Sequence, residues 1–182
     1  RRLLRLLERV APSLDMDVTG LEDPWRYRNK AEFTFGSSGG HVQLGFHAAG
    51  SYHRVVDLDD CLLLPEPMSR LLPIVRESAQ RSGAPVYSPR THQGFFRYLV
   101  VRASRKTGKI LACLVTAPGN RNIVEEMADE VLAKHSGVAS IYWGISAKAA
   151  DVALPDELVR LRGEQGLEER VGPFSLQVPP MA

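Results

Sequence analysis

Apolar and polar residues alternate in two neighbouring stretches of the chain, residues 31–35 and 42–46. A period of two predicts half-buried strands. The apolar positions of these stretches are Ala31, Phe33, Phe35, Val42, Leu44 and Phe46. The intervening sequence GSSGG predicts a hairpin turn, because glycine readily adopts the positive φ of tight turns. We expect the following run, YHRVVDLDDCLLL, to add a third strand that leads into a loop.

Helical periodicity appears in two stretches of the first half of the chain. Residues 1–10 place their apolar side chains on one face and arginines on the other, which predicts a surface helix or, alternatively, a helix lying on a membrane. Residues 66–83 predict a second helix, with Pro67 in its first turn and Gly83 at its C-terminal end. Pro73 falls inside this helix, so we expect a kink or a late start.

The second half of the chain begins with two apolar runs, FFRYLVVRAS and KILACLVTA, which predict strands joined by a cation-rich hairpin turn, RKTG. A helix is expected over residues 122–137, with Asn122 as its N-cap and Gly137 at its end. VASIYWGIS and FSLQV predict further strands. The segment AKAADVALPDELVRLRG, between those two, is expected to be a loop with at most one helical turn.

This order of elements favours an α+β fold. We expect a two-layer sandwich with a mainly antiparallel sheet, built from hairpins, and with the helices on one face. All 182 residues are expected to form a single domain. Within it, residues 1–24 would be a helix and linker, residues 25–93 a first unit of hairpin, strand and helix, and residues 94–182 a second unit of hairpin, helix and strand.

Composition and charge restrict the class of protein but do not identify a function. The chain is 44% hydrophobic with a net charge of +2, which is ordinary for a globular domain. It has no apolar run long enough to span a membrane and no signal peptide, so a cytoplasmic location is expected. Cys61 and Cys113 each lie in an apolar run and are expected to be buried, in a reducing compartment. Two cysteines cannot by themselves supply four thiolates to a cluster.

The sequence carries no complete active site or cofactor loop. Neither a G-x-G-x-x-G nor a P-loop motif is present, and we assign no catalytic, cofactor-binding or metal-ligating residue. His47 and His53 lie near Asp57 in the sequence, which leaves a small hydrolase as a distant alternative. Polar positions on half-exposed strands are the simpler interpretation of these histidines.

Cations beside aromatic residues form the remaining pattern, first from Trp25 to Lys30 and again from Phe95 to Lys109. Lys and Arg bind phosphates, and flat rings stack on unpaired bases, so the pattern suits RNA. The candidate RNA-binding residues are Arg28, Asn29, Lys30, Arg97, Arg102, Arg105 and Lys106. The alternative is that Arg28 or Lys30 only pairs with an acid such as Glu32 or Asp57.

Three blocks of sequence occur in an order that is similar to the central region of the RNA uracil-5-methyltransferase family. They are YRNKAEFTFG, LGFHAAGSYHRVVDLDDCLLL and FFRYLVVRASRKTGKILACLVT, and a weaker likeness continues through VASIYWGIS towards VPPMA. The resemblance implies an RNA-recognition and scaffold domain in which Arg28, Asn29 and Lys30 stand at the mouth of the active-site cleft. It also implies that 23S ribosomal RNA is a better candidate substrate than transfer RNA.

In this family a cysteine thiolate attacks C6 of a flipped-out uridine, and S-adenosylmethionine methylates C5. The resemblance implies that the nucleophile, the general base and the cofactor site belong to a catalytic domain outside this chain, so that the chain alone would be inactive. A [4Fe-4S] cluster from an upstream segment is an open alternative. The chain lacks an initiator Met and closes on VPPMA, so we expect a piece of a longer protein. A stand-alone RNA-binding or interaction module is the competing hypothesis.

Overall fold

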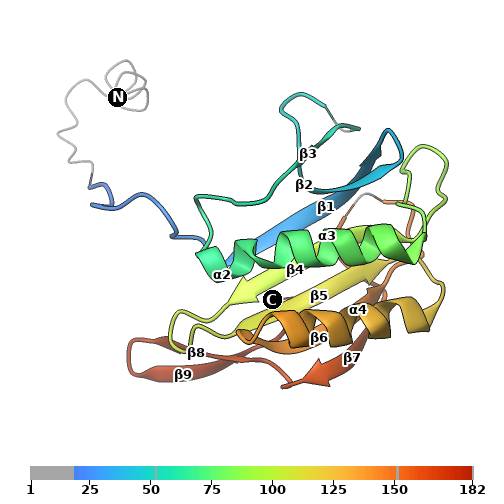
Figure 1. The fold of residues 1–182 in the computed structure, drawn as a ribbon. Helices are drawn as coiled ribbons and strands as arrows, with labels where there is room; N and C mark the ends of the chain where they lie inside the picture. Colours follow the sequence, from blue (N-terminus) through green and yellow to red (C-terminus); the bar gives the residue numbers. More distant parts are fainter. Residues whose placement is uncertain (1–18, 52, 151, 182) are drawn as a thin grey trace, which may run out of the picture.

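The structure is a computed structural model that describes residues 19–51, 53–150 and 152–181 (Figure 1). The helix expected over residues 1–10 lies outside these ranges. None of the described helices has the length and apolar content needed to cross a bilayer.

A seven-stranded sheet with the order β3-β2-β1-β4-β5-β6-β7 forms the centre of the molecule. Its strands are β1 (Lys30–Ser38), β2 (His41–His47), β3 (Val55–Asp57), β4 (Phe96–Ala103), β5 (Ile110–Thr116), β6 (Val138–Ile145) and β7 (Glu157–Gly163). Neighbouring strands are antiparallel except β5 and β6, which are parallel. A separate hairpin consists of β8 (Leu167–Val171) and β9 (Phe174–Val178).

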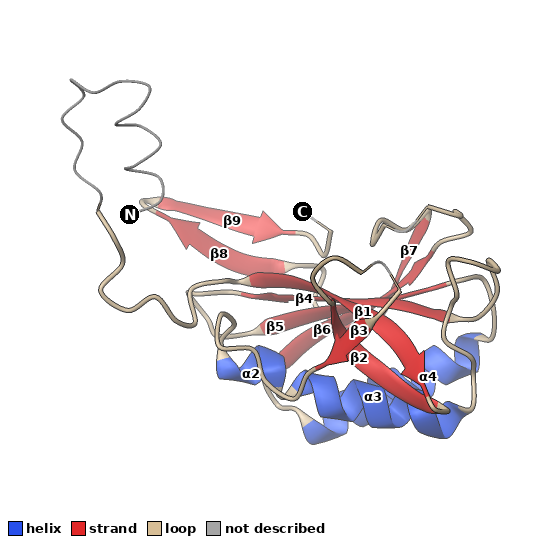
Figure 2. Cartoon of the chain, turned by 90° about the horizontal axis from the view of Figure 1, so that it is seen from above, coloured by secondary structure: helices blue, strands red, loops and turns tan. Residues whose placement is uncertain are grey.

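The parallel pair corrects one part of the expected fold. Helix α4 (Arg121–Lys134) connects β5 to β6, and such a crossover returns the chain in the same direction. The sheet is therefore large and mixed, and it is not built from hairpins alone. Helices α2 (Glu66–Ser69), α3 (Leu71–Ser82) and α4 all cover one face of it, while β8 and β9 lie on the opposite side (Figure 2). This arrangement fits the α+β class.

Local signals in the sequence explain the helix limits. The predicted helix over residues 66–83 is interrupted at Arg70 and resumes as α3, so that Pro73 falls in the first turn of α3, where it removes no intrahelical hydrogen bond. Gly83 ends α3 in the left-handed conformation, with φ of 68°. The N-cap of α4 is Asn120 rather than the predicted Asn122, because the Asn120 side chain accepts a 3.0 Å hydrogen bond from the backbone N–H of Asn122.

The predicted β1–β2 hairpin is confirmed. Gly39 and Gly40 connect the strands with φ values of 59° and 80°, and Ser38 pairs with His41. Positive φ at both central residues is typical of a two-residue hairpin loop. The apolar residues of β1 point into the core beneath the helices, and Glu32 on the other face is exposed.

Two strands occur where the sequence analysis did not expect them. β7 lies in the segment predicted as a loop, and β8 precedes the predicted strand β9. Both strands are rich in charged residues because β7 is the edge of the large sheet and β8 belongs to a two-stranded hairpin. Charged edge strands resemble loops in composition, and this explains the error.

The helix-free face of the sheet has its own apolar cluster. Its buried members are Tyr98, Val100, Leu111, Cys113, Val115, Tyr142 and Leu167. Leu167 reaches this cluster from β8, and Met181 packs against it from the end of the described chain. Hairpin β8–β9 and the segment after it therefore cover part of the face that carries no helix.

Candidate nucleic-acid interface

Pairing of β1 with β4 brings the two cationic segments of the sequence to the same end of the sheet. Lys30 is the Cα partner of Arg102, and the backbone N–H of Ala103 donates a 2.9 Å hydrogen bond to the carbonyl of Asn29. The β4–β5 turn, with Arg105 and Lys106, follows directly. Six of the seven predicted RNA-binding residues thus lie at or next to the junction of β1 and β4.

Arg28 and Asn29 present their side chains at this junction. The backbone N–H of Arg28 donates to the carbonyl of Leu63 over 2.9 Å, which fixes the main chain before β1. Arg28 is exposed and Asn29 is half-buried. Within the described residues, neither side chain forms a hydrogen bond or an ion pair. Both are therefore available to an outside ligand.

Lys30 differs from Arg28, because its ammonium lies 3.1 Å from a carboxylate oxygen of Glu32. This is the pairing that the sequence analysis kept as an alternative. Asp57, the other acid considered, instead accepts a 2.7 Å hydrogen bond from Arg76. Lys30 is thus partly neutralised within the domain.

The remaining cations of the junction contact hairpin β8–β9 or its surroundings. The backbone N–H of Arg105 donates a 2.8 Å hydrogen bond to the carboxylate of Glu169, and the Arg105 guanidinium donates to the carbonyl of Tyr27. Lys106 pairs with Glu168, and this ammonium holds the pKa of the Glu168 carboxyl below its usual range. Burial lowers the pKa of Arg102, which is half-buried. Acids of β8 therefore compensate part of the positive charge.

Two exposed aromatic residues complete this end of the molecule. Trp25 and Tyr27 flank Arg26, whose guanidinium binds both carboxylate oxygens of Asp60 at 2.8 Å. The same guanidinium also donates to the carbonyls of Cys61 and Leu64, at 2.9 and 2.8 Å. Arg26 thus fixes the segment that displays the two rings, a role that the sequence analysis did not foresee.

Arg97, the seventh candidate, lies elsewhere and is only 3% exposed. Its guanidinium donates to the carbonyls of Ser146, Lys148 and Ala150 at 3.2, 2.7 and 2.6 Å, and its carbon lies 4.2 Å from the centre of the Tyr87 ring. These contacts saturate most of its donors. Arg97 is therefore enclosed by the fold and does not lie on the surface where we expected it.

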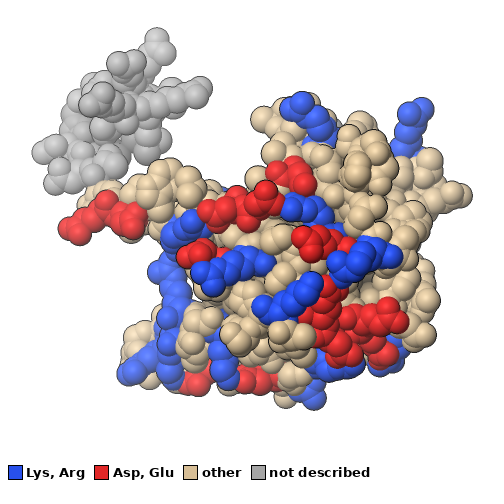
Figure 3. Space-filling model, in the orientation of Figure 1, with Lys and Arg blue, Asp and Glu red and all other residues tan. Residues whose placement is uncertain are grey.

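The face that carries the helices has charges of both signs, interspersed over its surface (Figure 3). Its ion pairs join Arg70 to Glu66, Arg76 to Asp57 and Asp59, Arg81 and Lys134 to Glu130, Arg121 to Glu125, and Arg162 to Asp129. A surface neutralised in this way attracts polyanions weakly. The junction of β1 and β4 is the better candidate for an RNA-binding surface.

The residues of the hydrolase alternative do not come together. A pocket of about 720 Å³ has both His47 and His53 in its wall, but Asp57 lies outside this wall and binds Arg76. Among the described residues, no group of three or more His, Cys, Asp or Glu is arranged to hold a metal ion.

Neither cysteine is placed as a nucleophile. Cys113 is buried in the helix-free face, as expected, and burial raises the pKa of its thiol to about 12. Cys61 is only half-buried, which corrects the expectation for this residue, and it packs against the cluster on the helical side. The two thiols thus lie on opposite faces of the sheet.

Comparison with known proteins gives relatives along most of the chain. No protein-family model matches it. An uncharacterized RNA methyltransferase of Clostridium tetani is 30% identical over 91% of this chain and 36% of its own length. One of Listeria innocua is 31% identical over 84% of this chain and 33% of its own. The chain thus spans about a third of the length of these relatives.

A solved structure shares the fold. The tRNA (uracil-54, C5)-methyltransferase of Pyrococcus abyssi, in complex with S-adenosyl-L-homocysteine, superposes with a TM-score of 0.75. The similarity covers 97% of this chain and 40% of the archaeal one, at 20% sequence identity. The mixed sheet with its one-sided helices is therefore an arrangement already known from a larger protein.

Proposed function

This chain belongs to the RNA (uracil-5-)-methyltransferase family, and we propose that it is the RNA-recognition and scaffold domain of such an enzyme. One observation carries the proposal: the pairing of β1 with β4 gathers Arg28, Asn29 and Lys30 with Arg102 and the β4–β5 turn at one end of the sheet. A rigid strand junction can hold phosphate-binding groups in fixed geometry.

The junction would bind RNA through two kinds of contact. Arg28 and Lys30 contact phosphates, and Lys30 exchanges its bond to Glu32 for a phosphate oxygen. Trp25 and Tyr27 offer exposed rings on which unpaired bases stack. Arg105 and Lys106 already bind the carbonyl of Tyr27 and the carboxylate of Glu168, so their main contribution is to fix the surface.

Methyl transfer is proposed for the whole protein and not for these 182 residues. S-adenosylmethionine would supply the methyl group. Because this chain has no glycine-rich cofactor loop, we propose that a part of the protein outside it binds the cofactor. The solved relative was crystallised with S-adenosyl-L-homocysteine, which supports this cofactor. The chain does not fit a [4Fe-4S] cluster, because its two thiols lie on opposite faces of the sheet.

An exposed apolar patch supports a domain that packs against another one rather than a stand-alone module. Val171 and Phe174 pair across hairpin β8–β9, and Leu176 follows on the same face of β9. Their exposed fractions are 60%, 68% and 48%. Contiguous exposed apolar side chains of this kind mark interaction surfaces. We propose that the catalytic part of the same protein covers them.

Sequence likeness to one branch of the family supports a proposal for the kind of RNA that is modified. The stretch HVQLGFHAAGSYHRVVDLDDCLL is more similar to the branch of the family that modifies ribosomal RNA, so 23S ribosomal RNA is preferred over transfer RNA. Such a substrate also implies a cytoplasmic protein.

Tryptophan fluorescence tests the proposed RNA surface directly, because Trp25 is 53% exposed whereas Trp143 is 5% exposed. Single-stranded uridine-containing RNA should quench the emission of Trp25 in a saturable way. Trp25→Ala should weaken binding about tenfold, which corresponds to the loss of one stacked base at about 1–3 kcal/mol. Trp25→Phe, which keeps a ring, should lose the signal but retain most of the affinity measured with labelled RNA. Absence of saturable binding at low salt would contradict the proposal.

A further inference from the structure

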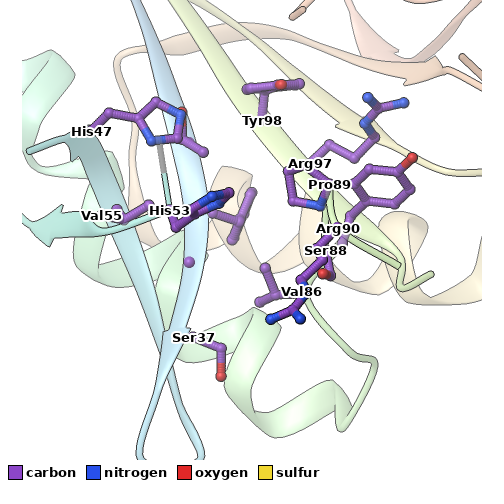
Figure 4. A pocket seen from close by; sticks show the side chains of 14 residues that line it. Ser37, His47, His53, Val55, Val86, Ser88, Pro89, Arg90, Arg97 and Tyr98 are labelled. Atoms are coloured by element: carbon purple, nitrogen blue, oxygen red, sulfur yellow. The ribbon is translucent and has the colours of Figure 1, made fainter. Parts of the chain in front are cut away.

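A second candidate site lies towards the other end of β1. It is the pocket of about 720 Å³ whose wall includes Thr34 to Ser37 of β1, Val55 of β3 and the loop of residues 86–90. Figure 4 shows His47 and His53 on one side of the pocket and Arg90 and Arg97 on the opposite side. A pocket of this volume can hold a nucleotide-sized ligand.

The wall of the pocket suits an anionic ligand. Besides two arginines and two histidines, it contains the hydroxyl groups of Ser37 and Ser88, and no Asp or Glu is among the described residues that line it. A concave surface with donors and without carboxylates favours phosphate groups. Tyr87, which is half-buried, adds aromatic surface to the same wall.

The loop that carries Arg90 is fixed by its own hydrogen bonds. The backbone N–H of Ser88 donates to the backbone carbonyl of Gln93, and the backbone N–H of His92 donates to the backbone carbonyl of Ser88. Both hydrogen bonds are 2.8 Å long. The Tyr87 hydroxyl lies 3.3 Å from Nδ1 of His92, and the buried Arg97 guanidinium packs on the Tyr87 ring. The pocket is therefore already formed without a ligand.

Two basic side chains of the wall, Arg90 and His53, are not used by the fold. Arg90 and His53 are exposed, and their side chains form no hydrogen bond or ion pair with the described part of the chain. Arg97 differs, because backbone carbonyls occupy its donors. Arg90 and His53 lie on opposite sides of the pocket in Figure 4 and come from separate segments of the chain.

We propose that this pocket binds one nucleotide of a single-stranded RNA segment, with Arg90 and His53 at its phosphate and the base beside the half-buried Tyr87. The inference rests on the proposed function for the source of the nucleotide, which is the strand that contacts Arg28. The pocket and the β1–β4 junction then hold two separate points of one RNA strand.

Amide NMR of the chain, titrated with uridine 5′-monophosphate, uridine and inorganic phosphate, tests the pocket itself. The monophosphate should shift the amides of Ser37, His53, Ser88 and Arg90 at millimolar concentrations, and uridine or phosphate alone should do so more weakly. Equal shifts and affinity with phosphate alone would mean a site for the free anion and would overturn the nucleotide assignment. No shift at these residues would overturn the site.

The variant Arg90→Ala/His53→Ala should raise the Kd of the monophosphate about tenfold, since neither side chain can then bind the phosphate. Arg160→Ala is the matched control, because Arg160 is an exposed arginine on β7, at the opposite edge of the sheet. Both variants change surface residues, and circular dichroism should show unchanged folding. A double variant that binds the monophosphate as well as the control does would contradict the proposal.

RNA affinity separates this inference from the proposed function. If Arg28→Ala weakens binding of a labelled single-stranded RNA and Arg90→Ala/His53→Ala does not, the pocket does not hold that strand and only the proposed function stands. If neither variant changes RNA binding, the proposed function fails, and with it the RNA source of the nucleotide. Weakening by both variants is the expected result.

Discussion

Arg97 shows how one side chain can connect distant parts of this domain. Its guanidinium binds three carbonyls of residues 146–150 and packs on the Tyr87 ring, so it joins β4 to the loop after β6 and to the loop that forms the pocket. Hydrogen bonds from a buried charge are worth more than neutral ones, and the carbonyls would be left without their partner in its absence.

Arg97→Ala should therefore lower the free energy of unfolding by about 3 kcal/mol, as for other buried charges whose partners are left unpaired. Arg97→Lys should recover part of this loss, because an ammonium reaches fewer of the carbonyls. Urea denaturation measures both values, with Arg160→Ala as an exposed control expected within about 0.5 kcal/mol of the wild type. An Arg97→Ala protein as stable as this control would show that the enclosed guanidinium contributes little.

The two cysteines should differ in reactivity. Burial raises the pKa of Cys113 to about 12, so at pH 8 it is a protonated thiol without access to solvent, whereas Cys61 is half-buried in a loop. A chromogenic disulfide reagent should label one thiol per native molecule and two after denaturation. Cys61→Ser should abolish the native reaction. Rapid labelling of Cys113 in the native protein would contradict its burial.

At the scale of elements, α3 and α4 lie side by side over the sheet and are linked by Glu130 (Figure 1). Lys134 of α4 has the largest effect on this carboxylate and lowers its pKa. Burial opposes this shift, but Ser78 and Arg81 of α3 lower the pKa further, so that the pKa of Glu130 falls to about 2. The Glu130 side chain is 20% exposed, so solvent screens these contacts only in part.

Glu130→Gln should lower the free energy of unfolding by about 1–2 kcal/mol at pH 7. Because the pKa is depressed in the folded state, this stabilisation is complete above the ordinary carboxyl pKa and is lost as the pH falls towards 2. The difference between variant and wild type in urea midpoint should therefore shrink from about pH 5 to about pH 3. Glu126→Gln, an exposed residue of the same helix, is the control. A difference independent of pH would contradict the ionic origin.

Elements defined by local signals were predictable, and those defined by partners were not. The β1–β2 hairpin follows from alternation and two glycines, and the limits of α3 follow from Pro73 and Gly83. The parallel pairing of β6 with β5 depends on where α4 packs, and no local sequence pattern predicts that position. β7 became a strand only because β6 offers it an edge to pair with.

At the scale of the whole molecule, the candidate RNA surface could likewise be predicted only in part from the sequence. Alternating cations and aromatics around Arg28 and Arg102 could be read from the sequence, but their meeting at one end of the sheet required the pairing of β1 with β4. The acids of β8 that bind Lys106 and Arg105 lie far along the chain, so their compensation of charge could not be foreseen. The pocket with His53 and Arg90 was missed for a similar reason, since its wall comes from several segments.

The salt dependence of RNA binding tests the central claim most directly, namely that the start of β1 contacts the phosphate backbone. The logarithm of the affinity for single-stranded RNA should fall linearly with the logarithm of the salt concentration. Arg28→Ala/Lys30→Ala should flatten this slope by about 1.4, because each phosphate that a cation no longer neutralises changes the slope by about 0.7. Arg160→Ala should leave the slope unchanged. A double variant whose slope equals that of the wild type would remove Arg28 and Lys30 from the RNA surface and contradict the account.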